Sequence, residues 1–218
     1  MPPDDFQFLQ SAEGLSLQTK IGVLAIDFVG DKINYARPLR RGKNELIAKA
    51  VGIGKGLTDV VDATAGLAQD AVVLARLGCR VRAVERIPWI APLLEDAKRR
   101  AAGQAEWLER IDFFCQDSRE FLQSLSVKPE VIYLDPMFPD PENKSKKSAL
   151  PRKEMQIFRN LVGPDGDARE LFDIALAKAQ FRVVVKRPKH APDLAAGVAH
   201  RFTGNSVRYD LYLTKGKI

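Results

Sequence analysis

The feature that most constrains the fold is a change of pattern at Asp59, after which short β-branched runs alternate with longer helical stretches. This alternation is typical of a parallel sheet whose strands are joined by crossover helices. Strands are expected at residues 59–64, 79–85, 111–116, 130–135 and 182–187, with an antiparallel edge strand at 205–215. Helices are expected at 68–78, 88–103 and 118–125, with two more before residue 182. The pattern predicts a doubly wound α/β domain over residues 57–218.

A different pattern precedes this domain. Residues 15–20, 23–28 and 32–37 alternate apolar and polar side chains and are separated by turn-forming residues, which predicts a small antiparallel meander. Asn44 is expected to cap the helix that follows, because Asn accepts hydrogen bonds from the free N–H groups of a first turn. We therefore predict a small N-terminal β-meander plus helix over residues 1–56.

Length, charge and cysteine content narrow the class of protein. A chain of 218 residues, 45% of them apolar, is expected to form one core. The net charge of +6 favours a polyanionic partner, although solubility alone also explains such a charge. Cys79 and Cys115 each lie in an apolar run that indicates a buried strand, and the chain has only two His residues. Neither a disulfide scaffold nor a metal site is expected. The absence of a basic leader and of a long apolar stretch predicts a cytoplasmic protein without a membrane partner.

In open α/β sheets ligands bind beyond the carboxyl ends of the strands, so the residues at those ends are informative. The first strand runs into the small residues of VVDATAGLAQD, where Gln69 and Asp70 begin the next helix. Small residues at this place also occur in simple packing. The second strand ends at Glu85, 23 residues after Asp62, where a carboxylate can accept hydrogen bonds from both ribose hydroxyls of a nucleoside. Arg86 beside it fits either the site or a solvated surface.

The third and fourth strands also end in polar groups. Gln116, Asp117 and Ser118 lie where an adenine edge would arrive, and Asp and Ser also favour helix caps, so both roles can hold. The sharpest local signal is LDPMFP at residues 134–139. Pro136 ends the strand, so Asp135 and the Pro136 carbonyl are expected to point into the crevice.

The LDPMFP motif suits methyl transfer to an amine on a base. The lone pair of such a nitrogen is delocalised into the ring, so hydrogen-bond acceptors must hold the amine protons and turn the nitrogen toward the methyl donor. Asp135 and the Pro136 carbonyl can supply these acceptors, and Phe138 can stack on the base. Because the amine proton becomes acidic once the methyl group has moved, we expect in-line positioning to matter more than base strength.

Basic residues cluster shortly after this motif. Five occur within ten positions, namely Lys144, Lys146, Lys147, Arg152 and Lys153. A basic loop beside the crevice would guide phosphates, and each contact would add salt-sensitive affinity. A merely solvated loop is the alternative. A second, smaller basic cluster lies at residues 40–43.

Several stretches resemble one bacterial family, the ribosomal RNA small subunit methyltransferase J family. They include AKAVG, VVDATAGLAQDA, VERIP, YLDPMFP and KEMQIFRNLVGPD, and they are spread over nearly the whole chain. The resemblance implies a Rossmann-like, S-adenosylmethionine (SAM)-dependent enzyme that methylates the N2 amine of one guanine near the 3′ end of 16S ribosomal RNA. S-adenosylhomocysteine would be the product, and 16S RNA or the small ribosomal subunit the partner.

The resemblance also assigns cofactor contacts. They would fall on Gln69, Asp70, Glu85, Arg86, Asp117, Ser118 and Asp135. Two positions depart from the family pattern: Ala68 stands where Gly is usual, and Asp117 where Ser is usual. The extra methyl group of Ala68 is expected to affect cofactor affinity rather than the reaction.

Other functions fit parts of the sequence. A nicotinamide-dependent oxidoreductase would need the phosphate-binding pattern G-x-G-x-x-G, which the sequence lacks. A DNA or other RNA base-amine methyltransferase would share the D-P-x-F motif. A noncatalytic RNA-binding relative would keep the fold and lose cofactor binding. The family resemblance favours the ribosomal RNA enzyme.

Overall fold

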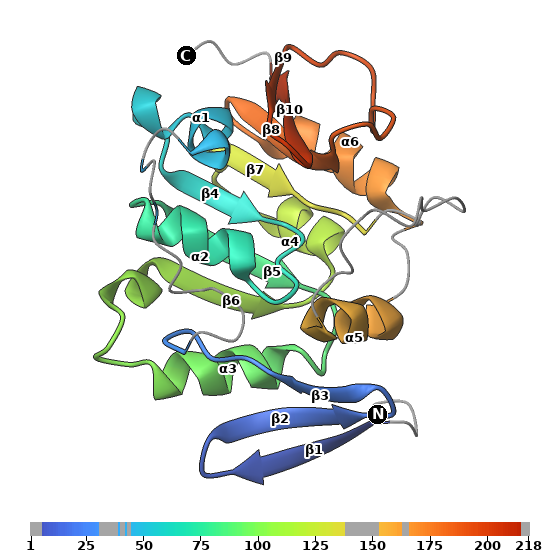
Figure 1. Ribbon diagram of the computed structural model, residues 1–218. Helices are drawn as coiled ribbons and strands as arrows, with labels where there is room; N and C mark the ends of the chain where they lie inside the picture. Colours follow the sequence, from blue (N-terminus) through green and yellow to red (C-terminus); the bar gives the residue numbers. More distant parts are fainter. Residues whose placement is uncertain are drawn as a thin grey trace.

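A seven-stranded sheet forms the centre of the molecule in this computed structural model (Figure 1). The structure describes residues 6–30, 39, 42, 45–137, 153–162 and 166–214. The strand order is β6-β5-β4-β7-β8-β10-β9. The strands are β4 (Asp59–Asp62), β5 (Arg80–Glu85), β6 (Ile111–Cys115), β7 (Val131–Leu134), β8 (Arg182–Pro188), β9 (His200–Thr203) and β10 (Val207–Leu213). Strands β4 to β8 are parallel, whereas β10 is antiparallel to both β8 and β9.

Helices cover both faces of this sheet, which confirms the predicted doubly wound fold (Figure 1). The helices are α1 (Leu46–Val51), α2 (Gln69–Arg76), α3 (Ala91–Arg100), α4 (Ser118–Ser124), α5 (Lys153–Val162) and α6 (Ala168–Lys178), with short 3-10 turns at Ile53–Lys55 and Glu106–Arg110. Successive strand residues belong to opposite layers. Val60 belongs to the buried cluster that includes residues of α1, α2 and α3, and Val61 belongs to the cluster that includes residues of α4 and α6. Because both faces are covered, the parallel strands are apolar almost throughout.

The C-terminal strands differ from the prediction. Residues 205–215 were expected at the sheet edge, but β10 lies inside the sheet, and β9 forms the edge beyond it. β9 was not predicted, because it is only four residues long and its side chains are mostly exposed. A short polar strand carries little hydrophobic pattern, and such strands are well suited to a solvated edge.

The N-terminal meander is confirmed, although its strands are not all the predicted ones. A three-stranded antiparallel sheet consists of β1 (Phe6–Ser11), β2 (Gly14–Thr19) and β3 (Gly22–Ala25). β2 and β3 match two predicted runs. β1 was missed, because four of its six residues are exposed. The third predicted run, 32–37, lies outside the described residues, as does Asn44.

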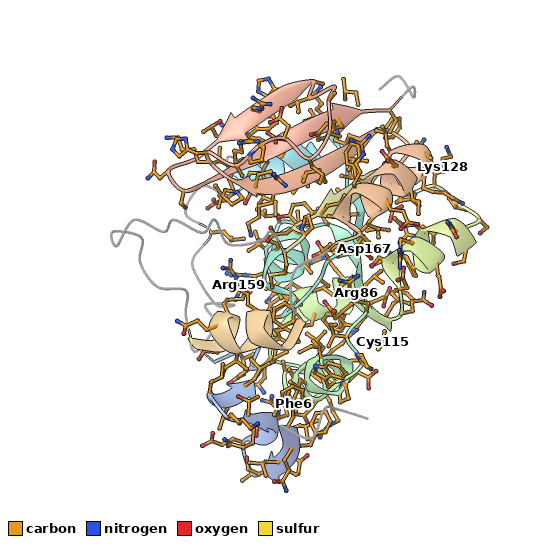
Figure 2. All side chains as sticks on the ribbon, turned by 90° about the vertical axis from the view of Figure 1, so that its right-hand side faces the viewer. Phe6, Arg86, Cys115, Lys128, Arg159 and Asp167 are labelled. Atoms are coloured by element: carbon orange, nitrogen blue, oxygen red, sulfur yellow. The ribbon has the colours of Figure 1, made fainter. Side chains whose placement is uncertain are left out.

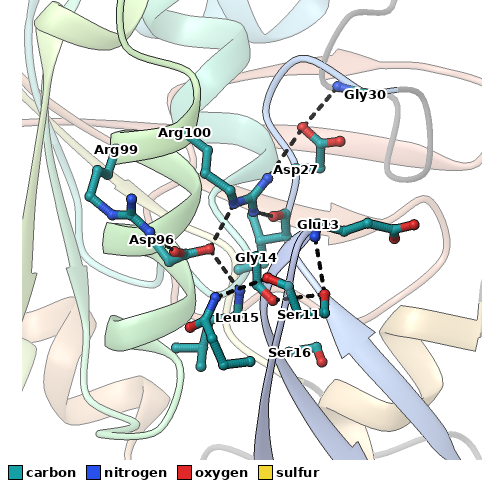
Figure 3. Close-up of polar contacts among 12 residues, drawn as sticks. Ser11, Glu13, Gly14, Leu15, Ser16, Asp27, Gly30, Asp96, Arg99 and Arg100 are labelled. Carbon is teal, nitrogen blue, oxygen red and sulfur yellow. Dashed lines mark hydrogen bonds and ion pairs between the residues drawn. The ribbon is translucent and has the colours of Figure 1, made fainter.

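This small sheet is attached to helix α3 by a buried carboxylate (Figure 3). Asp96 accepts a hydrogen bond from the Leu15 N–H at 2.9 Å and one from Arg100 Nε at 2.7 Å. Arg100 also donates to the Ile26 carbonyl. Burial raises the pKa of Asp96, but hydrogen bonds from Leu15, Arg100 and Arg99 outweigh burial and hold it below the ordinary value. The charged carboxylate therefore links β2 to α3.

Packing around the predicted boundary at residue 56 involves both parts of the chain. Helix α1 packs against β8, β9 and β10 of the large sheet, while β2 packs against α3 and β3 against α5. The division into an appendage over residues 1–56 and a methyltransferase domain over 57–218 stays a prediction.

The two cysteines lie in different surroundings. Cys79 is buried just before β5, as predicted, and burial raises its pKa to about 12. Cys115 is exposed, contrary to the prediction, because β6 is an edge strand and Cys115 is its last residue. Among the helices that the structure describes, none has the length and apolar character needed to span a membrane.

Candidate active site

Two adjoining cavities lie at the carboxyl ends of the parallel strands, where β5 and β7 flank β4 and the strand order changes direction. This switch point is where open α/β sheets bind ligands. The first cavity, of about 60 Å³, is lined by Glu85, Arg86, Asp117 and Ser118 among others. The second, of about 330 Å³, is lined by residues that include Gln69, Asp70 and Lys186. Both are lined by Thr64, Gly66, Asp135, Pro136, Met137 and Phe158.

The turn after β4 contributes residues to the walls of both cavities. Gly66 has a φ of +53°, and Phe158 lies so close that an added Cβ would be 3.2 Å from its ring. Ala68 has a φ of +60° and is the one described non-glycine residue with a positive φ. Such a conformation strains any L-residue with a side chain. Ala68 is fully buried and lines neither cavity, so its effect on cofactor affinity stays a prediction.

Glu85 joins the end of β5 to this turn. Its Oε2 accepts a hydrogen bond from the Gly66 N–H at 2.7 Å, and its Oε1 accepts one from the Ile87 N–H at 2.8 Å. A carboxylate has about four acceptor sites, so one side chain can bond both to backbone groups and to ligand hydroxyl groups. The side chain is therefore held rigidly by backbone groups on both sides while it lines the first cavity.

A chain of ion pairs forms the rim of the first cavity. Arg86 lies 2.8 Å from Asp167, and the two side chains point toward one another in Figure 2. Asp167 is also 3.6 Å from Arg119, which pairs with Asp117 at 2.8 Å. Arg86 is thus held in an ion pair at the cavity rather than standing as a solvated surface charge. No local pattern indicated Asp167, which lies 81 residues further along the chain.

Asp117 and Ser118 connect helix α4 to the site. Asp117 Oδ1 accepts a hydrogen bond from the Arg119 N–H at 2.8 Å, which confirms the predicted helix cap. The hydrogen bond from the Arg119 side chain is the largest cause that lowers the pKa of Asp117 to about 2. Ser118 is buried, and its hydroxyl donates to the Ala63 carbonyl at 2.7 Å. Its oxygen can still accept a hydrogen bond.

A cluster of ionisable side chains lines the second cavity. Lys186 Nζ lies 2.7 Å from Asp70 Oδ2 and 2.9 Å from Asp135 Oδ2. The Tyr133 hydroxyl donates to the same Asp70 oxygen at 2.6 Å. Asp62 is almost fully buried nearby, and burial, followed by the charge of Asp70, raises its pKa to about 8. Burial also raises the pKa of Asp135 above its ordinary value, and the charge of Lys186 opposes this rise.

The backbone of the LDPMFP motif is anchored as well. The Asp135 N–H donates to Thr64 Oγ1 at 2.6 Å, which fixes the end of β7 against the turn after β4. Asp135 and Pro136 line both cavities, in agreement with the expectation that they point into the crevice. Their roles in catalysis stay predictions.

Some predicted residues lie outside the described part of the chain. These are Phe138, Lys144, Lys146, Lys147 and Arg152, together with the basic residues at positions 40, 41 and 43. Lys153 is the first residue of α5, and its side chain is not described. The stacking role of Phe138 and the RNA contacts of the basic segment therefore stay predictions.

Sequence reasoning missed several residues of the site, above all Lys186 and Phe158. Lys186 was treated as part of an apolar strand, and the available signal was a Lys at the carboxyl end of that strand. Phe158 comes from α5, which lies beyond the carboxyl ends of the strands (Figure 1). Nothing in the local pattern of α5 distinguishes a cavity-lining aromatic residue from a core one.

The donor set fits a nucleoside that carries positive charge. Glu85 offers carboxylate oxygens to ribose hydroxyl groups in the first cavity, and Asp70 and Asp135 bring two further carboxylates to the second. SAM combines these features, because it joins an adenosine to a sulfonium and an ammonium group. The described residues contain no group of His, Cys, Asp and Glu suited to a metal ion. Fold and site together define a SAM-dependent methyltransferase.

Comparisons with known proteins agree with this class. A family model described as SAM-dependent methyltransferase matches residues 2–214. The ribosomal RNA small subunit methyltransferase J of Edwardsiella ictaluri is 48% identical over 201 residues, 89% of this chain and 79% of the relative. The same enzyme of Vibrio parahaemolyticus is 47% identical over 86% of this chain and 77% of the relative. The chain belongs to the ribosomal RNA small subunit methyltransferase J family.

A solved structure supports the same conclusion. The crystal structure of a SAM-dependent methyltransferase from Neisseria gonorrhoeae is 34% identical and has a TM-score of 0.75. The match covers 100% of this chain and 87% of that one.

Proposed function

We propose that this enzyme transfers a methyl group from SAM to the exocyclic N2 amine of a guanine in 16S ribosomal RNA. The names of its curated relatives support the small-subunit RNA as the substrate. The observation that carries the proposal is that Asp135 and Pro136 line both cavities at the end of β7. An acceptor pair at this junction can contact a base amine in one cavity beside a methyl donor bound across both.

The cofactor would be held by residues from four strand ends. Glu85 would accept hydrogen bonds from the ribose hydroxyl groups, and Arg86, Asp117 and Ser118 would surround the adenine side of the first cavity. Gln69 and Asp70 would face the methionine part in the second cavity. SAM, when bound, supplies an electrophilic methyl group on a positively charged sulfur.

Asp135 and the Pro136 carbonyl would act on the target amine. They accept hydrogen bonds from its two protons and turn the nitrogen lone pair toward the methyl group, while Phe138 stacks on the base. As the new N–C bond forms and the S–C bond breaks, the amine becomes acidic and loses one proton toward Asp135 or solvent. Positioning rather than strong base catalysis then accounts for most of the acceleration, an effect worth about 7–11 kcal/mol in model systems.

The RNA would be guided by basic residues near this junction. Lys144, Lys146, Lys147, Arg152 and Lys153 come shortly after the LDPMFP motif in the sequence, and this closeness along the chain supports the proposal. Each phosphate contact would release counterions and make binding sensitive to salt. We propose the cytoplasm, where ribosomal subunits are assembled, as the location.

Labelled SAM added to unmodified 16S RNA, to assembled small subunits and to duplex DNA tests the function. We expect label in N2-methylguanosine at a single nucleotide of the ribosomal substrates. Label in DNA, or on another base atom of the RNA, would contradict the proposal and identify a different base-amine methyltransferase. SAM binding without transfer to any substrate would indicate a noncatalytic RNA-binding relative.

A further inference from the structure

Lys186 connects two carboxylates that belong to different elements. It lies near the end of β8, Asp70 lies in the first turn of α2, and Asp135 follows β7. Nζ of Lys186 is within 3 Å of an oxygen of each carboxylate, at 2.7 Å and 2.9 Å. Only 23% of its side chain is exposed, against 38% for Asp135. The ammonium group is thus largely enclosed between them.

The geometry constrains how Asp135 can be used. Its backbone N–H donates a hydrogen bond to Thr64 Oγ1, which holds the main chain, and Lys186 lies 2.9 Å from its Oδ2, which restrains the carboxylate. Asp135 lines both cavities, so a restrained carboxylate can meet a ligand there. The Asp70 oxygen that Lys186 contacts also accepts a hydrogen bond from the Tyr133 hydroxyl. Asp70 is therefore itself restrained, and it helps to hold Lys186 in place.

We propose that Lys186 is a positioning residue for methyl transfer, which keeps the Asp135 carboxylate charged and oriented so that it accepts a hydrogen bond from the target amine. This inference rests on the proposed function, in which Asp135 is the acceptor. Lys186 itself does not touch the reacting atoms and acts through Asp135.

The charges around Asp135 explain why a cation is needed there. Several ionisable groups from neighbouring elements act on Asp135 or on its partner Lys186: Asp62 from β4, Asp70 from α2, Tyr133 from β7, Arg159 from α5 and Tyr209 from β10. Burial raises the pKa of Asp135, and the negative charge of Asp70 raises it further. Lys186 opposes both effects more strongly than Arg159 does.

Lys186 keeps its own charge in this environment. Burial lowers its pKa, but Asp135 and Asp70 raise it by more, to well above the ordinary value. When Lys186 is replaced by a neutral residue, Asp135 must take up a proton at a higher pH. A protonated carboxyl group is a weaker acceptor for an amine than a carboxylate, so methylation should slow on the acidic side of the pH profile.

Single-turnover methylation of unmodified small subunits at saturating SAM, measured between pH 5 and 9, tests this inference. In Lys186→Met we expect the acidic limb of the rate profile to move up by about 1–3 pH units. Lys186→Arg keeps the charge and should return the limb toward its wild-type position. Lys189→Met is the matched control, because it removes the same charge from an exposed residue three positions along. Its profile should match the wild type.

Folding and function are separated by further measurements. Thermal melts show whether each variant folds, and Lys186→Gln, which keeps a hydrogen-bond donor without the charge, replaces Lys186→Met if the latter does not fold. An unchanged acidic limb in the folded neutral variant overturns the inference.

A direct titration keeps this test independent of the proposed function. If the wild type methylates no ribosomal substrate, the proposed function fails, and the carbon-13 signal of the Asp135 carboxyl group decides the inference instead. The Asp135 carboxyl group should titrate at a higher pH in the neutral variant than in the wild type. Titration at the same pH in both proteins overturns the inference.

Discussion

At the scale of single residues, Asp135 separates chemistry from binding, because it lines both cavities. Asp135→Asn keeps one acceptor oxygen at the same place, so we expect reduced but measurable turnover. Asp135→Ala removes the acceptor, and kcat should fall far more than RNA affinity, because the missing hydrogen bond is one made at the reacting centre. Single-turnover methylation beside thermal melts measures both effects. A folded Ala variant that methylates at the wild-type rate would disprove the catalytic role.

Glu85 accepts hydrogen bonds from two backbone N–H groups and is proposed to bind the ribose of SAM, so its replacement should affect both stability and cofactor affinity. Glu85→Ala should weaken SAM binding by about 1–3 kcal/mol, because two ribose hydroxyl groups lose their acceptor. It should also lower stability, since the Gly66 and Ile87 N–H groups lose their partner. Glu85→Gln keeps one acceptor oxygen and serves as the control, with smaller losses in both. Calorimetry that gives the wild-type SAM affinity for the folded Ala variant would remove Glu85 from the cofactor site.

At the scale of elements, the N-terminal sheet depends on Asp96 of α3. Asp96→Ala removes the acceptor of the Leu15 N–H and of two arginines, and should cost about 1.5–3 kcal/mol in the free energy of unfolding. Urea denaturation measures the loss. Hydrogen exchange should quicken most in residues 14–25, because β2 and β3 lose their attachment, and Asp96→Asn should show a smaller change. If residues 14–25 exchange at the same rate in the wild type and in both variants, apolar packing alone attaches the sheet.

The basic segment after β7 can be tested as a unit. Replacing Lys144, Lys146 and Lys147 with Ala should weaken RNA binding and reduce the slope of log affinity against log salt by about 1 for each phosphate that is no longer neutralised. SAM affinity should not change. The matched control removes three lysines that precede parallel strands, at the opposite end of the sheet: Lys55, Lys128 and Lys178. Equal slopes in both triple variants would identify the segment as a solvated surface.

At the scale of the whole molecule, Asp62 links stability to pH. Its pKa is about 8 in the folded protein against an ordinary 3.8, with burial as the largest cause. Between about pH 4 and 8 the unfolded chain loses this proton while the folded protein keeps it. The contribution of Asp62 is therefore full below about pH 4 and declines as pH rises to about 8, by up to about 1.4 kcal/mol per pH unit.

Asp62→Asn isolates this contribution. Asn keeps an oxygen that can accept the Thr64 N–H, as Asp62 Oδ1 does at 3.1 Å, and it does not titrate. Urea denaturation without SAM at pH 5 and pH 8 should show the wild type losing stability relative to the variant. If the difference in stability between the wild type and the variant is the same at both pH values, Asp62 is ionised in the folded protein.

Much of the fold and part of the site followed from local patterns. The parallel strands after Asp59 were predicted because both of their faces are buried, and burial on both faces leaves a continuous apolar run. Glu85, Asp117 and Asp135 were predicted because polar residues that directly follow such runs lie at the carboxyl edge of the sheet. The family was also evident from the sequence, through stretches such as KEMQIFRNLVGPD that the fold alone does not require.

The contacts between distant segments came only from the tertiary structure. Lys186 meets Asp70 across 116 residues, and Arg86 meets Asp167 across 81. The place of β10 inside the sheet likewise depends on β9, a strand with almost no hydrophobic pattern. Periodicity reports which side of an element is buried, because burial acts on each residue separately. It does not report which polar groups meet, because that depends on how the whole chain closes around the sheet.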